Sequence, residues 1–221
     1  MSLATLIVIA KAPMPGRSKT RLCPPCTPEQ AAELAEAALG DTLAAVAGTR
    51  ALRRLVVLEG EAGRWLPPGF RVIPQRGHGL EQRLDAAFQD SGGPAFLVAM
   101  DTPQLTPELL GFALARLEAP GTDAVLGPTR DGGYWGIGLR RPDPAVFAGV
   151  PMSSRATQAA QLERLRALGL QTALLPVLTD VDTIAEARAV ARLAPRTRFA
   201  ATLRASGHAA DDHQAVTEAA A

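Results

Sequence analysis

The chain of 221 residues has little of several residue types, and each shortage excludes a class of protein. Aromatic residues make up 4% of the chain, too few for a platform that stacks on single-stranded nucleic acid. The 23 basic and 22 acidic residues give a net charge of +1, without the basic excess that is typical of nucleic-acid-binding proteins. We therefore expect no nucleic acid as a partner.

Long apolar runs are also absent, and none approaches the roughly 18 residues that a membrane span needs. The apolar run 6–10 has no basic residue before it, so it does not predict a signal peptide. These absences lead us to expect a cytoplasmic protein.

Cysteine is scarce as well: Cys23 and Cys26 are too few for a disulfide scaffold in a chain of this length. They form a CxxC pair before a predicted helix, as a redox pair would. A basic loop, and not a strand, comes directly before the pair. We expect thiols that stay reduced, with redox chemistry as the alternative.

Lysine is the scarcest cation, because 21 of the basic residues are arginine. Both lysines lie in the segment KAPMPGRSKTRL, which has no acidic residue and holds four cations: Lys11, Arg17, Lys19 and Arg21. Gly16 permits an unusual backbone angle, while Pro13 and Pro15 stiffen the loop. Successive N–H groups and four cations suit phosphate, although the Walker and GxGxxG spacings are absent. The segment therefore predicts a phosphate site, with a solvated basic loop as the alternative.

Apolar, β-branched segments alternate with helical patterns along most of the chain. Strands are predicted at 4–10, 52–58, 71–74, 94–100, 123–126, 134–139 and 170–175, and helices at 29–47, 80–88, 106–117, 153–168 and 184–193. The strand 134–139 alternates more than the others, as an antiparallel strand does. This order predicts an α/β fold: one Rossmann-like domain with a mostly parallel sheet and helices on both faces. The segment 195–221 is Ala-rich, shows no core pattern and is predicted to be an appendage.

Carboxylates follow two of the predicted strands. Asp101 comes directly after the strand 94–100, while Asp180 and Asp182 lie in TDVDT, after the strand 170–175. Ligands of such sheets bind beyond the carboxyl ends of the strands, and Mg²⁺ usually takes one or two protein carboxylates. Asp101 and Asp182 are therefore predicted to hold Mg²⁺ or Mn²⁺. The alternatives are a turn residue for Asp101 and an N-cap of the helix 184–193 for Asp182.

A third cluster is GPTRDGGYW, residues 127–135. Its glycines predict a tight turn that lets the backbone approach a ligand, and its aromatic side chains suit packing on a sugar ring. The alternative is a hairpin turn with aromatic residues in the core. The predicted acceptor and sugar residues are Asp131, Gly132, Gly133, Tyr134 and Trp135. Asp131 is also the candidate catalytic base.

Together, KAPxPGxxKTRL, MDTPxL, GPxxDGGYxxxGL and DVDT resemble the small bacterial proteins assigned to the GT-A-fold glycosyltransferases, in the nucleotide-diphospho-sugar transferase superfamily. These proteins are similar to the molybdenum-cofactor and phospholactate guanylyltransferases. The resemblance covers roughly residues 4–193 and implies a GT-A domain at 1–194, followed by the appendage.

The resemblance also implies roles for single residues. The diphosphate would be bound by the loop residues Lys11, Pro13, Gly16, Arg17, Lys19 and Arg21. Asp101 would be the metal aspartate that stands in for the DxD motif, with Asp182 as the second ligand. Gln75, Gly77 and Gly79 would lie near the base. One departure concerns base and sugar preference: the family tends to show a GDLGxR-like stretch where this chain has HGLEQR.

Three functions follow from these motifs. The leading one is metal-dependent transfer of a sugar from a nucleotide-diphosphate donor to a small-molecule acceptor. The alternative is nucleotidyl transfer, in which an NTP gives its NMP group to a phosphorylated acceptor and Lys19 stabilises the α-phosphate. The third is a nucleotide-binding module without catalysis. The sequence leaves the sugar, the base, the acceptor and the formation of a homodimer open.

Overall fold

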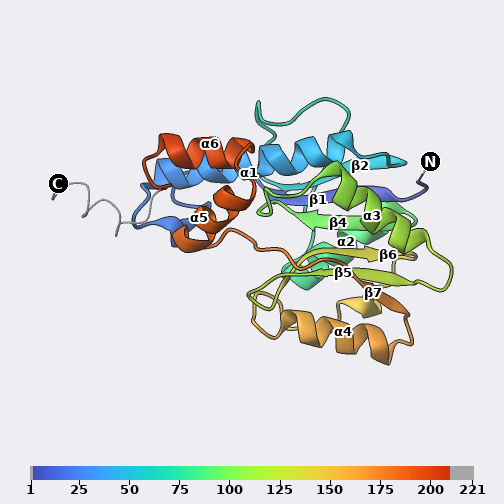
Figure 1. Cartoon of the computed structure of the whole chain (residues 1–221). Helices are drawn as coiled ribbons and strands as arrows, with labels where there is room; N and C mark the ends of the chain where they lie inside the picture. Colours follow the sequence, from blue (N-terminus) through green and yellow to red (C-terminus); the bar gives the residue numbers. More distant parts are fainter. Residues whose placement is uncertain (1, 210–221) are drawn as a thin grey trace, which may run out of the picture.

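The computed structural model describes residues 2–209 and shows one seven-stranded sheet between two layers of helices (Figure 1). The strand order is β3-β2-β1-β4-β6-β5-β7. The strands are β1 Thr5–Lys11, β2 Arg53–Glu59, β3 Arg71–Pro74, β4 Ala95–Ala99, β5 Ala124–Pro128, β6 Tyr134–Leu139 and β7 Thr172–Leu174. Strand β6 runs antiparallel to its neighbours β4 and β5, and the other pairings between these strands are parallel. The predicted fold class and the antiparallel strand are confirmed.

Helices cover both faces of the sheet, as predicted. They are α1 Pro28–Gly48, α2 Leu80–Ser91, α3 Pro107–Glu118, α4 Thr157–Ala167, α5 Ile184–Leu193 and α6 Arg198–Ala205, with short 3-10 turns η1 Thr20–Leu22 and η2 Pro144–Val146. On one face, α1 and α3 pack Leu43 and Leu114 against Val8 of β1. On the other face, α2 and α4 pack Phe88 and Leu165 into a second cluster. Successive side chains of a strand point to opposite faces, so the buried strands are apolar on both.

Helix starts follow their capping residues. Thr27 and Thr106 cap α1 and α3, and each is followed by proline. Helix α5 begins at a capping box: the Thr183 hydroxyl accepts from the N–H of Glu186, and the Glu186 carboxylate accepts from the N–H of Thr183. The cap of α5 is thus Thr183, and the alternative role of Asp182 as N-cap is wrong.

The end of the described chain departs from the predicted appendage. Helix α6 lies along α1 (Figure 1), and its Phe199 and Leu203 are buried against Leu34 of α1. The Asp41 carboxylate accepts from two backbone N–H groups at the start of α6, at 2.9 and 2.8 Å. The expectation of no core pattern is therefore wrong for 198–205, where an eight-residue helix has too few apolar positions to reveal its buried side. Residues 210–221 lie outside the described residues, and the division at 194 stays a prediction.

Within residues 2–209, no helix combines the length and the apolar character that crossing a bilayer requires.

Candidate active site

A cleft of about 950 Å³ opens at the edge where the parallel strands end. This edge is where open α/β sheets bind their ligands. The cleft is formed by the loop after β1, the loop after β4, the turn between β5 and β6, and the segment that leads into α5. All residues predicted for the site line it except Pro13, Gly16, Gly77 and Gly132.

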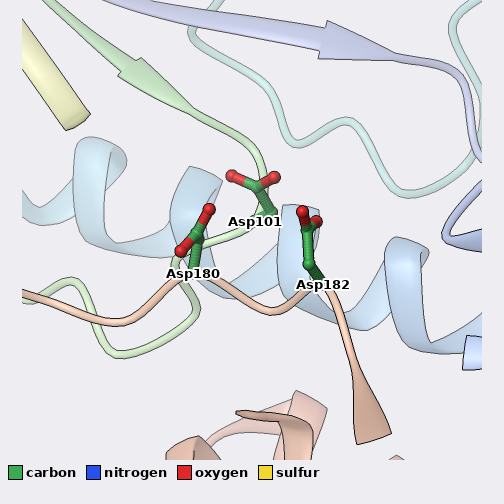
Figure 2. Close-up of side chains that lie close together, drawn as sticks. All are labelled: Asp101, Asp180 and Asp182. Atoms are coloured by element: carbon green, nitrogen blue, oxygen red, sulfur yellow. The ribbon is translucent and has the colours of Figure 1, made fainter. Parts of the chain in front are cut away.

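Three carboxylates meet in this cleft, and we call Asp101, Asp180 and Asp182 the acidic triad (Figure 2). One oxygen from each lies within 4.8 Å of the others. The backbone N–H of Val181 donates to the carbonyl of Asp101 at 3.0 Å, which holds the two segments together. Asp180 was noted in TDVDT but was not among the predicted metal ligands. The signal was its spacing of two from Asp182, because alternate residues of an extended segment point to the same side.

The members of the triad differ in their electrostatic surroundings. Burial, followed by the charges of Asp101, Asp131 and Asp182, raises the pKa of Asp180 to about 7. Burial acts in the same direction on Asp182, but Lys19 and Arg21 outweigh it and hold the pKa of Asp182 below its ordinary range. Within the described part of the chain, no cation forms an ion pair with Asp180.

Lys19 connects the basic loop to the triad. Its Nζ atom lies 3.0 Å from Oδ2 of Asp101 and 3.0 Å from Oδ1 of Asp182, and 12% of its side chain is exposed. Burial alone would lower the pKa of Lys19, but the two carboxylates together raise it above its ordinary value. Arg21 donates from Nη1 to the other oxygen of Asp182 at 2.8 Å.

Lys11 is placed differently from Lys19. Its side chain is 62% exposed, and its Nζ lies 3.5 Å from Oε2 of Glu59, its neighbour across β1 and β2. Arg17 is also exposed and forms no ion pair with a described residue. The two lysines of the loop therefore have separate environments, one open to solvent and one closed by carboxylates.

The side chain of Gln75 is engaged by the protein itself. Its Nε2 donates to the carbonyls of Ala10 and Val57, at 2.7 and 3.3 Å, and its Oε1 accepts from Arg83 at 3.1 Å. Arg83 also pairs with Glu59. Gln75 thus braces the ends of β1 and β2 while it lines the cleft. Glu59 and Arg83 were not anticipated from the sequence, because only the packing of α2 beside the end of β2 brings them together.

The turn after β5 is held by Asp131. Its Oδ1 accepts from the hydroxyl of Thr129 at 2.5 Å and from the N–H of Gly133 at 2.9 Å. Gly132 has φ +93°, and a Cβ placed there would lie 2.1 Å from the carbonyl oxygen of Arg155. The close approach that Gly132 permits is therefore to the protein backbone, which corrects the expectation that it faces a ligand.

The two aromatic residues after this turn have different places. Trp135 is 1% exposed, its Nε1 donates to the carbonyl of Pro176 at 2.9 Å, and its ring meets the ring of Phe96 edge-on. Trp135 therefore offers no face to a sugar, and here the alternative of a core aromatic is correct. Tyr134 is partly buried, its hydroxyl is 3.4 Å from Oε1 of Gln161, and burial raises the pKa of Tyr134.

The donor set of the triad suits a divalent ion. Mg²⁺ and Mn²⁺ prefer hard oxygen ligands, and three carboxylates supply them. The ammonium group of Lys19 is already within hydrogen-bond distance of two of these carboxylates, which shows that the place attracts positive charge. The residues present therefore fit the ion that the sequence predicted.

The cysteines lie beside the site without entering the cleft. Both are free thiols, and Cys26 is 4% exposed within the apolar cluster that joins α1, α5 and α6.

Comparison with known proteins gives one family and several solved structures. The family described as "Uncharacterized protein conserved in bacteria (DUF2064)" matches residues 31–154. No curated protein matches the chain. A solved structure from Desulfovibrio desulfuricans G20, described as a "putative nucleotide-diphospho-sugar transferase", is 29% identical with a TM-score of 0.85, and the match covers 94% of this chain and 96% of that one.

Two more distant structures share the fold alone. The mannosyltransferase PcManGT from Pyrobaculum calidifontis, in complex with GDP-Man and Mn²⁺, is 13% identical with a TM-score of 0.55, over 99% of this chain and 79% of that one. The 2-C-methyl-D-erythritol 4-phosphate cytidylyltransferase from Thermus thermophilus is 16% identical with a TM-score of 0.53, over 88% and 100%. The nucleotide-diphospho-sugar transferase fold that the motifs implied is therefore confirmed.

Proposed function

The chain belongs to the DUF2064 family, and we propose that it is a metal-dependent glycosyltransferase that uses a nucleotide-diphosphate sugar. One observation carries this proposal: a cationic loop lies directly against three clustered carboxylates at the carboxyl-end edge of the sheet. A nucleoside diphosphate and a divalent ion together need this combination of charges. The 29% identity with the Desulfovibrio protein, over nearly the whole of both chains, supports the same class of substrate.

The acidic triad would hold the ion. Asp101 and Asp182 are the ligands expected from the sequence, and the geometry adds Asp180 as the third. When bound, Mg²⁺ or Mn²⁺ supplies positive charge that stabilises the departing nucleoside diphosphate. The protein's part is to keep the three carboxylates in place through the contact between Val181 and Asp101 and through the capping box of α5.

The basic loop would bind the diphosphate oxygens. Arg17 and Lys11 are exposed in the cleft, and Lys19 and Arg21 reach it from beside the triad. Arginine offers a planar fork and lysine a mobile point charge, so the loop combines fixed and movable donors. These cations would also stabilise the charge that develops on the leaving diphosphate.

Asp131 is the proposed catalytic base for the acceptor hydroxyl. Its Oδ1 is fixed by Thr129 and Gly133, while the residue as a whole is exposed on the cleft. A carboxylate held in this way can accept a proton from a hydroxyl within hydrogen-bond distance. Tyr134 and Gly133 line the same part of the cleft and would contact the sugar or the acceptor.

A panel of nucleotide sugars tests the proposal. The protein is incubated with UDP-, GDP-, CDP- and ADP-sugars and with Mg²⁺ or Mn²⁺, and release of the nucleoside diphosphate is measured. We expect hydrolysis of at least one donor, and its loss in Asp131→Asn under conditions in which calorimetry still shows donor binding. Absence of binding for every donor would rule the proposal out.

Nucleotidyl transfer is the second candidate, and the position of Lys19 favours it. An ammonium group beside the triad is well placed to stabilise an α-phosphate while an acceptor phosphate attacks it and pyrophosphate leaves. Pyrophosphate release from an NTP and a phosphorylated acceptor would identify this reaction. If the protein binds nucleotide but catalyses neither reaction, the remaining function is a nucleotide-binding module without catalysis.

A further inference from the structure

The ammonium group of Lys19 lies between two members of the acidic triad. Its Nζ is 3.0 Å from an oxygen of Asp101 and 3.0 Å from an oxygen of Asp182. Asp101 and Asp182 come from segments about 80 residues apart in sequence, and the lysine joins them across the cleft. These are two of the carboxylates that we assign to the divalent ion. Two of the proposed metal-binding oxygens therefore already contact a cation of the protein itself.

A divalent ion would have to compete with this lysine. The Lys19 side chain is 12% exposed, so little water screens its charge from an ion that enters the triad. Arg21 takes the second oxygen of Asp182 at 2.8 Å and adds another positive charge. Lys19 and Arg21 thus offset the charges of Asp101 and Asp182, which should reduce the affinity of these two carboxylates for a free divalent ion.

Phosphate oxygens bound in the same cleft would be an alternative partner for Lys19. It belongs to the basic loop, and it lines the cleft together with Arg17, which is exposed. Its four-carbon side chain is flexible and its ammonium group can reorient, which a planar guanidinium does less easily. Phosphate oxygens bound by this loop would attract the ammonium group away from the carboxylates.

We propose that Lys19 is an exchangeable counter-ion: it holds Asp101 and Asp182 in the nucleotide-free protein and moves to the phosphates of the bound nucleotide, which frees both carboxylates for the divalent ion. This step rests on the proposed function, because it takes the triad as the metal site and the basic loop as the phosphate site. The nucleotide and the ion then raise each other's affinity by the same factor, as linkage requires.

Binding of Mn²⁺ alone tests the exchange without any activity measurement. The dissociation constant is measured by electron paramagnetic resonance in nucleotide-free wild-type protein and in Lys19→Met, which has no ammonium group. We expect Lys19→Met to bind Mn²⁺ at least about tenfold more tightly, within the usual range of such couplings. Lys19→Arg keeps the charge but cannot hold both carboxylates at once, so it should bind Mn²⁺ more tightly than the wild type and less tightly than Lys19→Met.

Lys11→Met is the matched control, because it removes the other lysine of the same loop. Lys11 is 62% exposed and pairs with Glu59, away from the triad. Its loss should change the Mn²⁺ dissociation constant by no more than about twofold, since exposed charges act weakly on one another. A tenfold gain in Lys11→Met as well would overturn the proposal, because any loss of positive charge would then have the same effect.

The remaining outcomes separate the exchange from the proposed function. Equal or weaker Mn²⁺ binding in Lys19→Met, with clear binding to the wild type, overturns the exchange and leaves the metal site standing. No Mn²⁺ binding to either protein overturns both. Thermal unfolding gives an independent measure for a variant that folds less well: Mn²⁺ should raise the unfolding temperature of Lys19→Met more than that of the wild type, and an equal or smaller rise contradicts the exchange.

Discussion

At the scale of single residues, the cleft uses lysine and arginine for different tasks. Lys19 serves two carboxylates with one small ammonium group, while Arg21 stays 75% exposed and reaches one of them from outside. The scarcity of lysine had marked this residue in the sequence, but its partners depend on the fold. The backbone of Lys19 lies in the left-handed region at φ 48°, which an ordinary residue adopts at some cost, and this indicates that the position is fixed by its surroundings.

Lys19→Arg is therefore expected to keep the charge and lose most of the activity. A guanidinium group is broader and planar, so it cannot occupy the place of Nζ at 3.0 Å from both carboxylates. We expect kcat/KM to fall roughly 100-fold, as when one preorganised donor is lost. Arg116→Lys, on the exposed side of α3, is the control and should retain near-normal kinetics. Full activity in Lys19→Arg would mean that any cation suffices there.

Asp180→Asn tests the carboxylate of the triad that was not among the predicted ligands. If the triad binds the ion as a unit, removing the charge of Asp180 should weaken Mn²⁺ binding at least about tenfold, since even the loss of a group that only orients a metal ligand typically costs roughly 10- to 100-fold. Asp101→Asn should show a loss of similar size. Glu36→Gln, an exposed carboxylate on α1, should leave the calorimetric Mn²⁺ affinity unchanged. An unaffected Asp180→Asn would limit the site to Asp101 and Asp182.

At the scale of elements, local sequence signals predicted most of the structure and part of the site. Strands β1 and β4 could be predicted from their apolar runs, and helices α1 and α3 from their Thr-Pro starts. Local signals are sufficient for such elements because burial on both faces and helix capping depend on neighbouring residues. Helix α6 was missed because its burial depends on docking to α1. The cap of α5 was ambiguous because both Asp182 and Thr183 are capping types, and only the geometry decides between them.

The capping box of α5 also positions the triad, and Thr183→Ala should show it. Glu186 accepts from the N–H groups of both Asp182 and Thr183, at 3.0 and 2.7 Å. Loss of the cap should lower the free energy of unfolding by about 1 kcal/mol and also weaken Mn²⁺ binding. Thr27→Ala removes the equivalent box of α1, so it should cost similar stability in urea unfolding and leave Mn²⁺ binding intact. Equal Mn²⁺ affinities in the two variants would show that the capping box of α5 does not position the triad.

At the scale of the whole molecule, the cleft is assembled from segments that are remote in sequence. The loop after β1, the loop after β4, the turn after β5 and the segment before α5 meet because parallel strands end at one edge. The motifs identified these segments, since each follows a strand end. Contacts between them, such as the ion pairs of Lys19 and the bonds of Gln75, depend on strand register and side-chain reach, which one sequence does not specify.

Trp135 links the packing of the sheet to the position of the triad. Its ring packs on Phe96 of β4, and its Nε1 donates to the carbonyl of Pro176, in the segment that leads to Asp180. A Cβ on Gly127 would lie 2.2 Å from this ring, so the indole fills the space beside Gly127. Trp135→Phe should therefore leave a void and an unpaired carbonyl, and it should lower the free energy of unfolding by about 2 to 3 kcal/mol.

The same substitution should also loosen the metal site, because the segment 176–182 loses one of its anchors to the sheet. Urea unfolding gives the stability, and calorimetry with Mn²⁺ gives the affinity of the folded variant, which we expect to fall several-fold. Trp65→Phe, at a partly buried position, is the matched control and should change both quantities little. Lower stability with unchanged Mn²⁺ affinity would show that the remaining backbone contacts of this segment, among them the one between Val181 and Asp101, hold the triad without help from Trp135.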